Sequence, residues 1–366
     1  MEFGTKTTME RHVVSSVPAT LVRGGTSKCW IFRKSDLPAE LGELNRLLIR
    51  MFGSPDVRQI DGVGGASSTT SKAIVVNDLR GADGAVQYQF AQVAIDKPAV
   101  EWDSNCGNCA TGLGLYALHV GLVAPQDGTT RVRILNTVTG LSLLCEIPTP
   151  DGLVPAYGGR RLDGQHYPGV PVDIIFERAS WSTFGAEFPT GNAVDEITVG
   201  AITYQVTLID AGAPAALFDA ADFGVTGQEC SEDLHGLVDI APQLRSAAAK
   251  LMKIPDDLTS IPKVGIIGAP PAGEPGVSAR MISMSALHPA IGLTSAVAIA
   301  AASGREGSIV NRYACPSPQV LRAPGMTIHL LKGATSFSLD APAPSQVAFQ
   351  RSARVISEGT VLVPGD

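Results

Sequence analysis

Two helical stretches without a polar face constrain the fold of this chain more than any other feature. The first, residues 113–120, reads Leu-Gly-Leu-Tyr-Ala-Leu-His-Val and follows a polar turn. The second, residues 296–302, reads Ala-Val-Ala-Ile-Ala-Ala-Ala and follows another glycine-containing turn. A helix that is apolar on all sides must be surrounded by protein. Each stretch is therefore predicted to form the buried centre of one half of the chain.

Short strands are predicted around both helices, and residues 41–51 and 234–252 have the apolar spacing of further helices. The loop-like residues 180–192 separate the two halves. The order of elements is not the regular βαβ alternation of a doubly wound sheet. We therefore expect an α+β fold of two domains with mixed, mostly antiparallel sheets. Strands are predicted at 17–22, 30–32, 73–76, 87–95, 131–135, 141–147 and 172–176, and at 197–199, 202–209, 215–218, 264–267 and 279–284.

The composition narrows the classes of function. The chain has 366 residues, 45% of them hydrophobic and 17% charged, which suffices for two well-filled domains. The formal net charge is −7, whereas nucleic-acid binding needs a basic surface, so no nucleic-acid partner is expected. No apolar run reaches the roughly 20 residues of a membrane span, so no membrane association is expected. Six scattered cysteines indicate reduced thiols and hence a cytoplasmic protein.

The first eight residues have the appearance of a leader derived from a cloning vector. Met9 is then a candidate native start. We exclude this leader from the prediction of the fold.

Cys106 is expected at the N-terminus of the first buried helix, between Asn105 and the pair Gly107 and Asn108. The free N–H groups and dipole of such a terminus attract a carboxylate, and the same field lowers the pKa of a thiol. The alternative is an inert buried cysteine. With Cys109 the residue forms a C-x-x-C pair, but a zinc site needs four ligands and no second pair is present. Cys109 is therefore expected to pack inside the helix.

Lys72 ends a loop of glycine, serine and threonine, residues 61–72, and begins an apolar strand. In that position it is a candidate general base, and the alternative is a surface lysine. The hydroxyl and amide groups of the loop are candidates for binding carboxylates, although the loop lacks the spacing of a P-loop. The alternative for the loop is a plain flexible connection. The candidate residues are Gly64, Gly65, Ser68 and Ser71.

Two further stretches contain candidate binding residues. Residues 23–27 offer Arg23 as a fork for a carboxylate, with Thr26 and Ser27 beside it, or form an ordinary turn. Polar residues before the second buried helix are candidates for binding an anion. For the histidine among them, the alternative is a purely structural role. The chain has neither a G-x-S-x-G elbow nor a G-x-G-x-x-G fingerprint, which disfavours a hydrolase and a dinucleotide-binding enzyme. The candidates near the second helix are Arg280, Ser283, His288, Gly292 and Thr294.

Taken together, these motifs resemble the PrpF family, which includes 2-methylaconitate isomerases, 4-oxalomesaconate tautomerases and aconitate Δ-isomerases. The resemblance implies a diaminopimelate-epimerase-like fold of two pseudo-symmetric domains, each with a sheet wrapped around a central helix. The last strand is then expected to return to the first domain, giving domains of 9–186 plus 345–366 and of 187–344. The motifs occur in order at 23–28, 61–72, 105–108, 208–212, 262–263, 280–288 and 351–354.

The resemblance also implies a function for the cleft between the domains. The expected activity is an allylic double-bond shift or a cis–trans isomerisation of a small unsaturated di- or tricarboxylic acid, without metal or organic cofactor, in a homodimer. Lys72 and Cys106 are implied as the proton-transfer pair, and residues 105–108 as a carboxylate site. The chemistry is consistent, because helix N-termini stabilise the dienolate that proton removal creates. Lys72 is the preferred base, with Cys106 as a second acid or base or as a polarising contact.

Two other functions compete with this one. A two-cysteine amino-acid racemase or epimerase of the same fold needs a second thiol at the second helix start, but residues 288–294 contain none and Cys315 lies more than twenty residues later. A non-catalytic carboxylate-binding protein is the other alternative. A sequence that lacked Lys72 or Cys106 would favour it, and both residues are present. Cys29, Trp30 and Cys109 depart from the usual family pattern, which leaves the identity of the substrate open.

Overall fold

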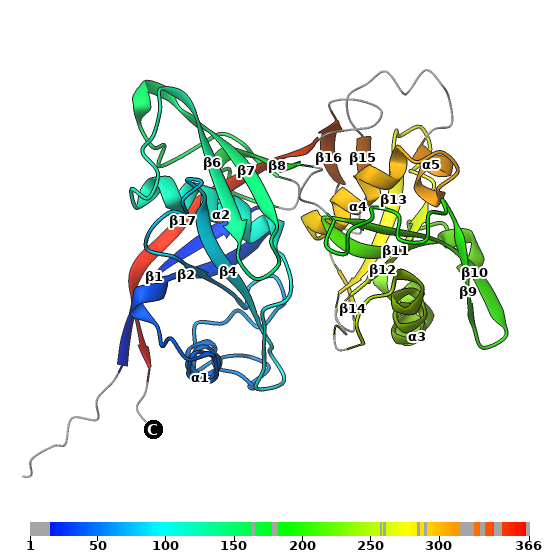
Figure 1. Ribbon diagram of the computed structural model, residues 1–366, viewed down its shortest axis with the longest axis horizontal. Helices are drawn as coiled ribbons and strands as arrows, with labels where there is room; N and C mark the ends of the chain where they lie inside the picture. The colour runs from blue at the N-terminus through cyan, green and yellow to red at the C-terminus, as the bar shows by residue number, and fades with distance from the viewer. Residues whose placement is uncertain are drawn as a thin grey trace, which may run out of the picture.

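A computed structural model gives the fold as two lobes joined by strands (Figure 1). The N-terminal lobe contains β1 to β8, β17, α1 and α2, and the C-terminal lobe contains β9 to β16 and α3 to α5. The candidate start at Met9 and the residue Cys315 lie outside the described part of the chain. The described residues are 15–162, 165–177, 182–256, 258, 261–283, 286–288, 291–314, 326–329, 334–339 and 346–363.

The N-terminal lobe is a closed barrel of eight strands around one helix. The pairing runs β1–β2–β3–β4–β6–β7–β8–β17 and returns to β1. Helix α2 (Gly107–His119) lies inside, and its residues from Gly107 to Leu118 are all buried. The strands are β1 (Ser15–Gly24), β2 (Ser27–Arg33), β3 (Lys72–Val76), β4 (Val86–Val93), β6 (Gly128–Asn136), β7 (Ser142–Thr149), β8 (Val170–Glu177) and β17 (Gln346–Val363).

Strand β17 closes the barrel and also links the lobes. It pairs antiparallel with both β1 and β8, while its first residues pair with β16 (Ala334–Leu339) of the C-terminal lobe. The red ribbon in Figure 1 follows this path between the lobes. Outside the barrel, α1 (Leu41–Phe52) packs against its strands. The short β5 (Val100–Glu101) pairs antiparallel with the end of β4.

The C-terminal lobe is a sheet with helices on both faces. Helix α4 (Leu293–Ser303) is buried from Leu293 to Ala302 and contacts β10 and β11. Helix α3 (His235–Met252) packs on the other face, because Ala215 and Leu217 of β11 join the core of α4 whereas Ala216 and Phe218 join that of α3. The strands are β9 (Asp195–Val199), β10 (Ile202–Ala211), β11 (Ala213–Asp219), β12 (Lys263–Gly268), β13 (Val277–Ser283), β14 (Ala286–Leu287) and β15 (Met326–His329), and α5 (Ile309–Ala314) follows α4.

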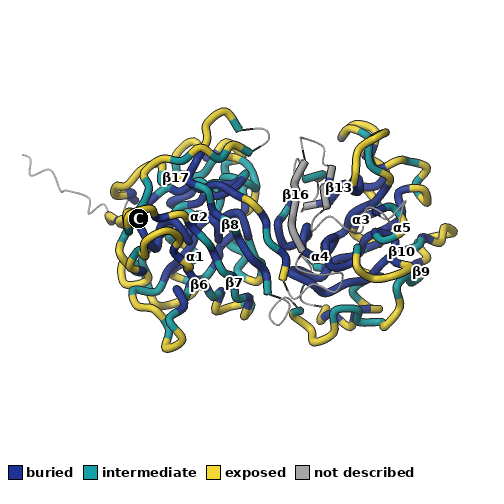
Figure 2. The backbone as a smooth tube through the Cα atoms, turned by 90° about the horizontal axis from the view of Figure 1, so that it is seen from above, coloured by how far each residue is buried: buried dark blue, intermediate teal, exposed yellow. Residues whose placement is uncertain are grey.

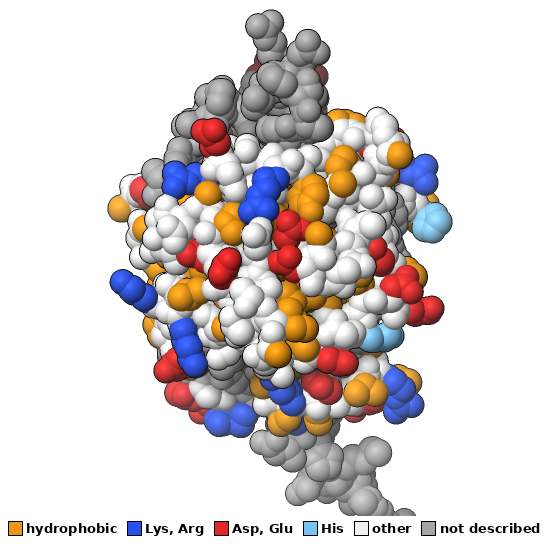
Figure 3. Space-filling view, turned by 90° about the vertical axis from the view of Figure 1, so that its right-hand side faces the viewer, with side chains coloured by type: hydrophobic (Ala, Val, Ile, Leu, Met, Phe, Trp, Pro, Cys, Tyr) orange, Lys and Arg blue, Asp and Glu red, His pale blue; other side chains and the backbone are white. Residues whose placement is uncertain are grey.

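The burial pattern follows from this arrangement. Buried residues concentrate on α2, on α4 and on the strand faces toward them, whereas exposed residues lie in the connections (Figure 2). On the outer face of the C-terminal lobe, acidic and basic side chains are interspersed (Figure 3). None of the described helices combines the length and the apolar character needed to cross a membrane.

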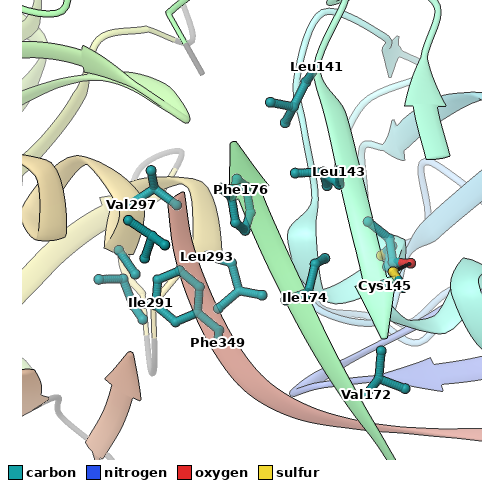
Figure 4. Packing of buried hydrophobic residues seen from close by; sticks show 14 of the residues in the cluster. Leu141, Leu143, Cys145, Val172, Ile174, Phe176, Ile291, Leu293, Val297 and Phe349 are labelled. Carbon is teal, nitrogen blue, oxygen red and sulfur yellow. Dashed lines mark hydrogen bonds between the residues drawn. The ribbon is translucent and has the colours of Figure 1, made fainter. Parts of the chain in front are cut away.

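One hydrophobic cluster continues from the barrel into α4. At the junction, the rings of Phe176 of β8 and Phe349 of β17 meet edge to face with their centres 5.9 Å apart. Leu293 and Val297 of α4 lie beside them (Figure 4). The first turns of α2 and α4 touch here, because a Cβ on Gly107 would lie 2.7 Å from the Cβ of Leu293.

The expected architecture is confirmed at the level of the sheets and helices. Both apolar stretches are buried helices, and the sheets are mixed but mostly antiparallel. Parallel pairs occur only at β2–β3, β4–β6, β11–β12 and β13–β15 among the described strands. The short β5, β14, β15 and α5 were not predicted, because segments of two to six residues carry too little periodicity.

We predict that Gly24→Ala destabilises the barrel by about 1–3 kcal/mol. A Cβ at this position would overlap with the backbone oxygen of Asn108 and the backbone nitrogen of Gly112, neither of which can rotate away. Urea unfolding followed by circular dichroism measures the change. Gly359→Ala is the matched control, since nothing lies within 4 Å of its added methyl group. Equal stability of the two variants contradicts the close packing of β1 on α2.

Candidate active site

A cavity of about 390 Å³ lies between the two lobes. Both lobes contribute side chains to its wall, so neither forms the site alone. The N-terminal lobe supplies Ser27, Ser68, Lys72, Phe90, Gln92, Asp96, Lys97, Glu101, Ser104, Asn105, Cys106, Gly107 and Asn108. The C-terminal lobe supplies Arg245, Lys263, Met281, Ile282, His288, Gly292, Leu293, Thr294 and Ser295.

The N-termini of α2 and α4 both open onto this cavity. Cys106 is the N-cap of α2 and Gly292 is the N-cap of α4, where no side chain caps the helix. The first N–H groups of a helix have no partner within the helix. Together with the helix dipole they favour an anion. Two such termini at one cavity favour the binding of negatively charged groups there.

Lys72 is held in place by its neighbours on β4. Its Nζ donates a hydrogen bond of 2.6 Å to Oε1 of Gln92, the residue opposite it in the β3–β4 pair. Gln92 in turn donates 2.9 Å from Nε2 to the backbone oxygen of Ser71. The ammonium group also lies 5.0 Å from the centre of the Phe90 ring. The amine is therefore fixed at the cavity wall, with one face against an aromatic ring.

The Cys106 thiol does not have the low pKa expected for a thiol at a helix N-terminus. Its Sγ donates to Sγ of Cys109 at 3.0 Å, and the N–H of Cys109 donates back to it at 3.3 Å. The hydrogen bond to Cys109 and then burial raise the pKa of Cys106, while Lys72 and the N–H group oppose the rise. The expectation of an activated thiolate was therefore wrong. The raised pKa favours the protonated form of Cys106, which can give a proton.

The turn before α2 is held by residues that lie outside the cavity wall. The Asn105 side-chain oxygen accepts from Asn136 at 2.8 Å and from Thr139 at 2.7 Å. Nδ2 of Asn108 donates 3.1 Å to Oγ1 of Thr26. Thr26 therefore supports Asn108 and does not line the cavity itself.

The structure brings most, but not all, of the candidate residues to the cavity. Those at its wall are Ser27, Ser68, Lys72, Asn105, Cys106, Gly107, Asn108, His288, Gly292 and Thr294. Those elsewhere are Arg23, Thr26, Gly64, Gly65, Ser71 and Arg280, and the side chain of Ser283 lies outside the described part of the structure.

The two arginines among the candidates bind backbone oxygens. One guanidinium nitrogen of Arg23 donates to the carbonyl oxygens of Gly25 and Ser352, which ties β1 to β17. The buried Arg280 donates to the carbonyl oxygens of Glu229 and Ala279, each at 3.0 Å. Burial lowers the pKa of both guanidinium groups. Their geometry is that of groups that hold the fold.

The polar loop before β3 is organised around Gln59. Its Oε1 accepts 2.5 Å from the buried Ser71 hydroxyl and 2.8 Å from the N–H of Ala66. Gly64 lies so close to this amide that a Cβ would overlap with it, and Gly65 packs in the same way on Thr70. Of the four loop candidates Gly64, Gly65, Ser68 and Ser71, only Ser68 reaches the cavity wall. The composition of the loop did not distinguish residues that hold the loop together from a residue that lines the cavity.

Sequence reasoning missed Gln92, Lys263 and Arg245 as residues of the cavity. Gln92 lies in a strand of alternating pattern, and its signal was a polar residue that the strand buries. Lys263 and Arg245 come from a strand start and from a helix of the C-terminal lobe, so only tertiary structure joins them. Among the described residues, no group of three or more His, Cys, Asp or Glu side chains has the geometry of a metal site.

The chain is similar over nearly its whole length to known proteins. The PrpF protein family model matches residues 14–364. The chain is 35% identical over 356 residues to a 4-oxalomesaconate tautomerase of Pseudomonas putida, covering 96% of this chain and 97% of that protein. It is 34% identical over 387 residues to a 2-methyl-aconitate isomerase of Cupriavidus necator, covering 96% and 98%.

Solved structures are similar over the same extent. A crystal structure of a methylitaconate-delta-isomerase has a TM-score of 0.77 at 27% identity, covering 96% of both chains. A hydroxyproline epimerase from Agrobacterium vitis has a TM-score of 0.56 at 12% identity, covering 96% of this chain and 93% of that one. The second similarity concerns the fold alone.

We predict that Cys109→Ala lowers the pKa of Cys106. The substitution removes the acceptor of the thiol proton, which is the largest cause of the raised pKa. The rate of alkylation of Cys106 by iodoacetamide, followed by peptide mass spectrometry, should then rise at lower pH than in the unaltered protein. Cys145→Ala is the control, because that buried thiol instead lies against the carbonyl oxygen of Ala110. An unchanged pH profile in Cys109→Ala contradicts the role of this hydrogen bond.

Proposed function

The chain belongs to the PrpF protein family, and from this membership we propose that it isomerises a small unsaturated di- or tricarboxylic acid by proton transfer. The observation that carries the proposal is the meeting of Lys72, Cys106 and two helix N-termini at one cavity. The helix ends bind negative charge, and the two side chains stand beside it as base and acid. Candidate substrates are aconitate, methylaconitate and oxalomesaconate.

The proposed reaction begins with removal of a proton from the carbon next to the double bond. Lys72 takes this proton as the general base, and the electron pair spreads through the double bond into a conjugated carboxylate. The resulting dienolate carries extra negative charge on oxygen. The N–H groups at the starts of α2 and α4 stabilise that charge as it develops. Gln92 and Phe90 keep the amine at its position while the ligand changes.

Return of the proton completes the isomerisation. Delivery to the far carbon of the allyl unit moves the double bond, and the substrate then has the same atoms in a new arrangement. Rotation about the former double bond before reprotonation interconverts cis and trans forms, because that bond has single-bond character in the dienolate. The raised pKa of Cys106 favours its role as a proton donor in this step. The proton that Lys72 took then passes to the thiolate of Cys106, which restores both groups for the next turnover.

The alternative of a two-cysteine epimerase is disfavoured by the second helix start. Gly292, Leu293, Thr294 and Ser295 line the cavity there, and Cys106 is the one thiol among the described residues of the wall. A racemase that removes a proton from one face and returns it from the other needs an acid or base on each side. A non-catalytic binding protein is disfavoured because the Lys72 amine is held by Gln92 beside a protonated thiol.

We also propose that the lobes are pseudo-symmetric domains of 9–186 plus 345–366 and of 187–344, in a cytoplasmic homodimer. Pairing of β17 with β1 and β8 supports the assignment of the last strand to the first domain. The five described cysteines are all free, which suits a reducing compartment. Light scattering on the purified protein tests the dimer.

We predict that the protein exchanges deuterium into one or more acids of a panel in D2O without added cofactor. The panel comprises cis- and trans-aconitate, methylaconitate, methylitaconate and oxalomesaconate, and proton NMR follows both exchange and isomerisation. Lys72→Met should lower the rate by about 10²–10⁴-fold, as expected for loss of a general base. Cys106→Ser should lower it less, because a hydroxyl still donates a hydrogen bond.

Lys250→Met, on the exposed face of α3, is the matched control and should retain full activity. Absence of exchange with every acid in the panel contradicts the proposed function. Full activity of Lys72→Met and of Cys106→Ala contradicts the assignment of the proton-transfer pair.

A further inference from the structure

Two cations of the C-terminal lobe lie together at the cavity, opposite Lys72. Arg245 of α3 donates 3.2 Å from Nε to the carbonyl oxygen of Pro262, which places its guanidinium beside Lys263. Both side chains are half-buried and both line the cavity. Like charges held together in a place of low water content repel each other strongly. An anion that lies between or beside the two groups reduces this repulsion.

The strand topology places Lys263 at the position that Lys72 has in the other lobe. Lys72 is the first residue of β3, which pairs parallel with β2 and antiparallel with β4. Lys263 is the first residue of β12, which pairs parallel with β11 and antiparallel with β13. The two lysines therefore enter one cavity from equivalent strand starts on opposite lobes. A ligand between the lobes meets a lysine at each side.

Charged groups of both signs face Lys263. Burial is the largest cause, and the neighbouring Arg245 the next, of a pKa of Lys263 lowered to about 8. Glu101 and Asp103 act in the opposite direction, and Lys72 adds to the lowering. Of the other ionisable groups at the wall, Asp96 and Lys97 lie in the turn between β4 and β5, and His288 follows β14. Among the described wall residues the carboxylates are Asp96 and Glu101, and the cations are Lys72, Lys97, Arg245 and Lys263.

We propose that Lys263 and Arg245 bind the substrate carboxylate that lies farthest from the reacting carbon, and that they thereby select di- and tricarboxylic acids over monocarboxylic acids. The inference rests on the proposed function and assigns to the same cavity a second carboxylate subsite. One carboxylate lies at the helix N-termini, beside Lys72 and Cys106, and the other lies at the cationic pair. A cavity of about 390 Å³ accommodates a six-carbon acid in this orientation.

Binding of saturated acids tests the subsite without any turnover. Tricarballylate carries three carboxylates and butyrate carries one, and neither contains a double bond to be shifted. Isothermal titration calorimetry at pH 7 should show tight binding of tricarballylate and much weaker binding of butyrate. Lys263→Met should weaken tricarballylate by about 10–100-fold, the range for loss of a hydrogen bond to a charged group. The affinity for butyrate should stay unchanged.

The pH dependence separates this role from a merely structural one. The lysine is charged below its pKa of about 8 and becomes neutral as the pH rises through that value, whereas the ligand carboxylates stay ionised throughout. The affinity for tricarballylate should therefore fall between pH 7 and pH 9.5. In Lys263→Arg the fall should disappear, because a guanidinium keeps its charge over this range. Arg245→Gln should weaken tricarballylate in the same selective way, and Lys250→Met is the control.

Each outcome decides the proposal. Equal weakening of both acids in Lys263→Met, affinity without a pH dependence, or no binding of tricarballylate to the unaltered protein overturns it. If Lys263→Met isomerises a panel acid with an unchanged KM and a lowered kcat, Lys263 acts in proton transfer and the subsite is refuted. Selective binding of tricarballylate by a protein that exchanges no panel acid refutes the proposed isomerase and leaves the subsite standing.

Discussion

The burial of two apolar helices with their N-termini together is the constraint on which the rest of the structure depends. Neither α2 nor α4 has a polar side to turn to solvent, so each needs its own surrounding sheet. The N–H groups at their starts still need hydrogen-bond acceptors. The protein meets both needs by joining the two sheets through the pairing of β17 with β16 and leaving a cavity where the helix starts meet. The anion site is a consequence of this packing.

The Cys106 thiol shows how two effects of known direction compete at such a site. A helix N-terminus stabilises a thiolate, whereas burial and a hydrogen bond donated to a second thiol stabilise the neutral form. Here the neutral form wins, because Cys109 accepts the proton of Cys106 within the first turn of the same helix. The unequal pair of a lysine and a protonated thiol suits a proton shuttle better than two equal bases do.

Much of this arrangement could be predicted from the sequence, and the remainder depends on tertiary structure. Apolar periodicity located both buried helices, and the polar turn located Cys106 at a helix start. Lys72 was identified from the junction of a polar loop with an apolar strand. The other residues of the cavity wall, Gln92, Arg245 and Lys263, could not be predicted from local sequence patterns, because the packing of distant segments brings them to the cavity. The same limitation assigned a ligand role to Arg23 and Arg280, whose guanidinium groups bind backbone oxygens.

In the proposed mechanism an unsaturated acid lies across the cavity, with one carboxylate at the helix N-termini and the reacting carbon beside Lys72 and Cys106. A crystal structure of the protein with tricarballylate tests this claim most directly. We expect one ligand carboxylate within hydrogen-bond distance of the N–H groups of Gly107 and Asn108, and a ligand carbon near Nζ of Lys72. A ligand bound outside the cavity, or bound in it with no carboxylate at either helix N-terminus, contradicts the proposed mechanism.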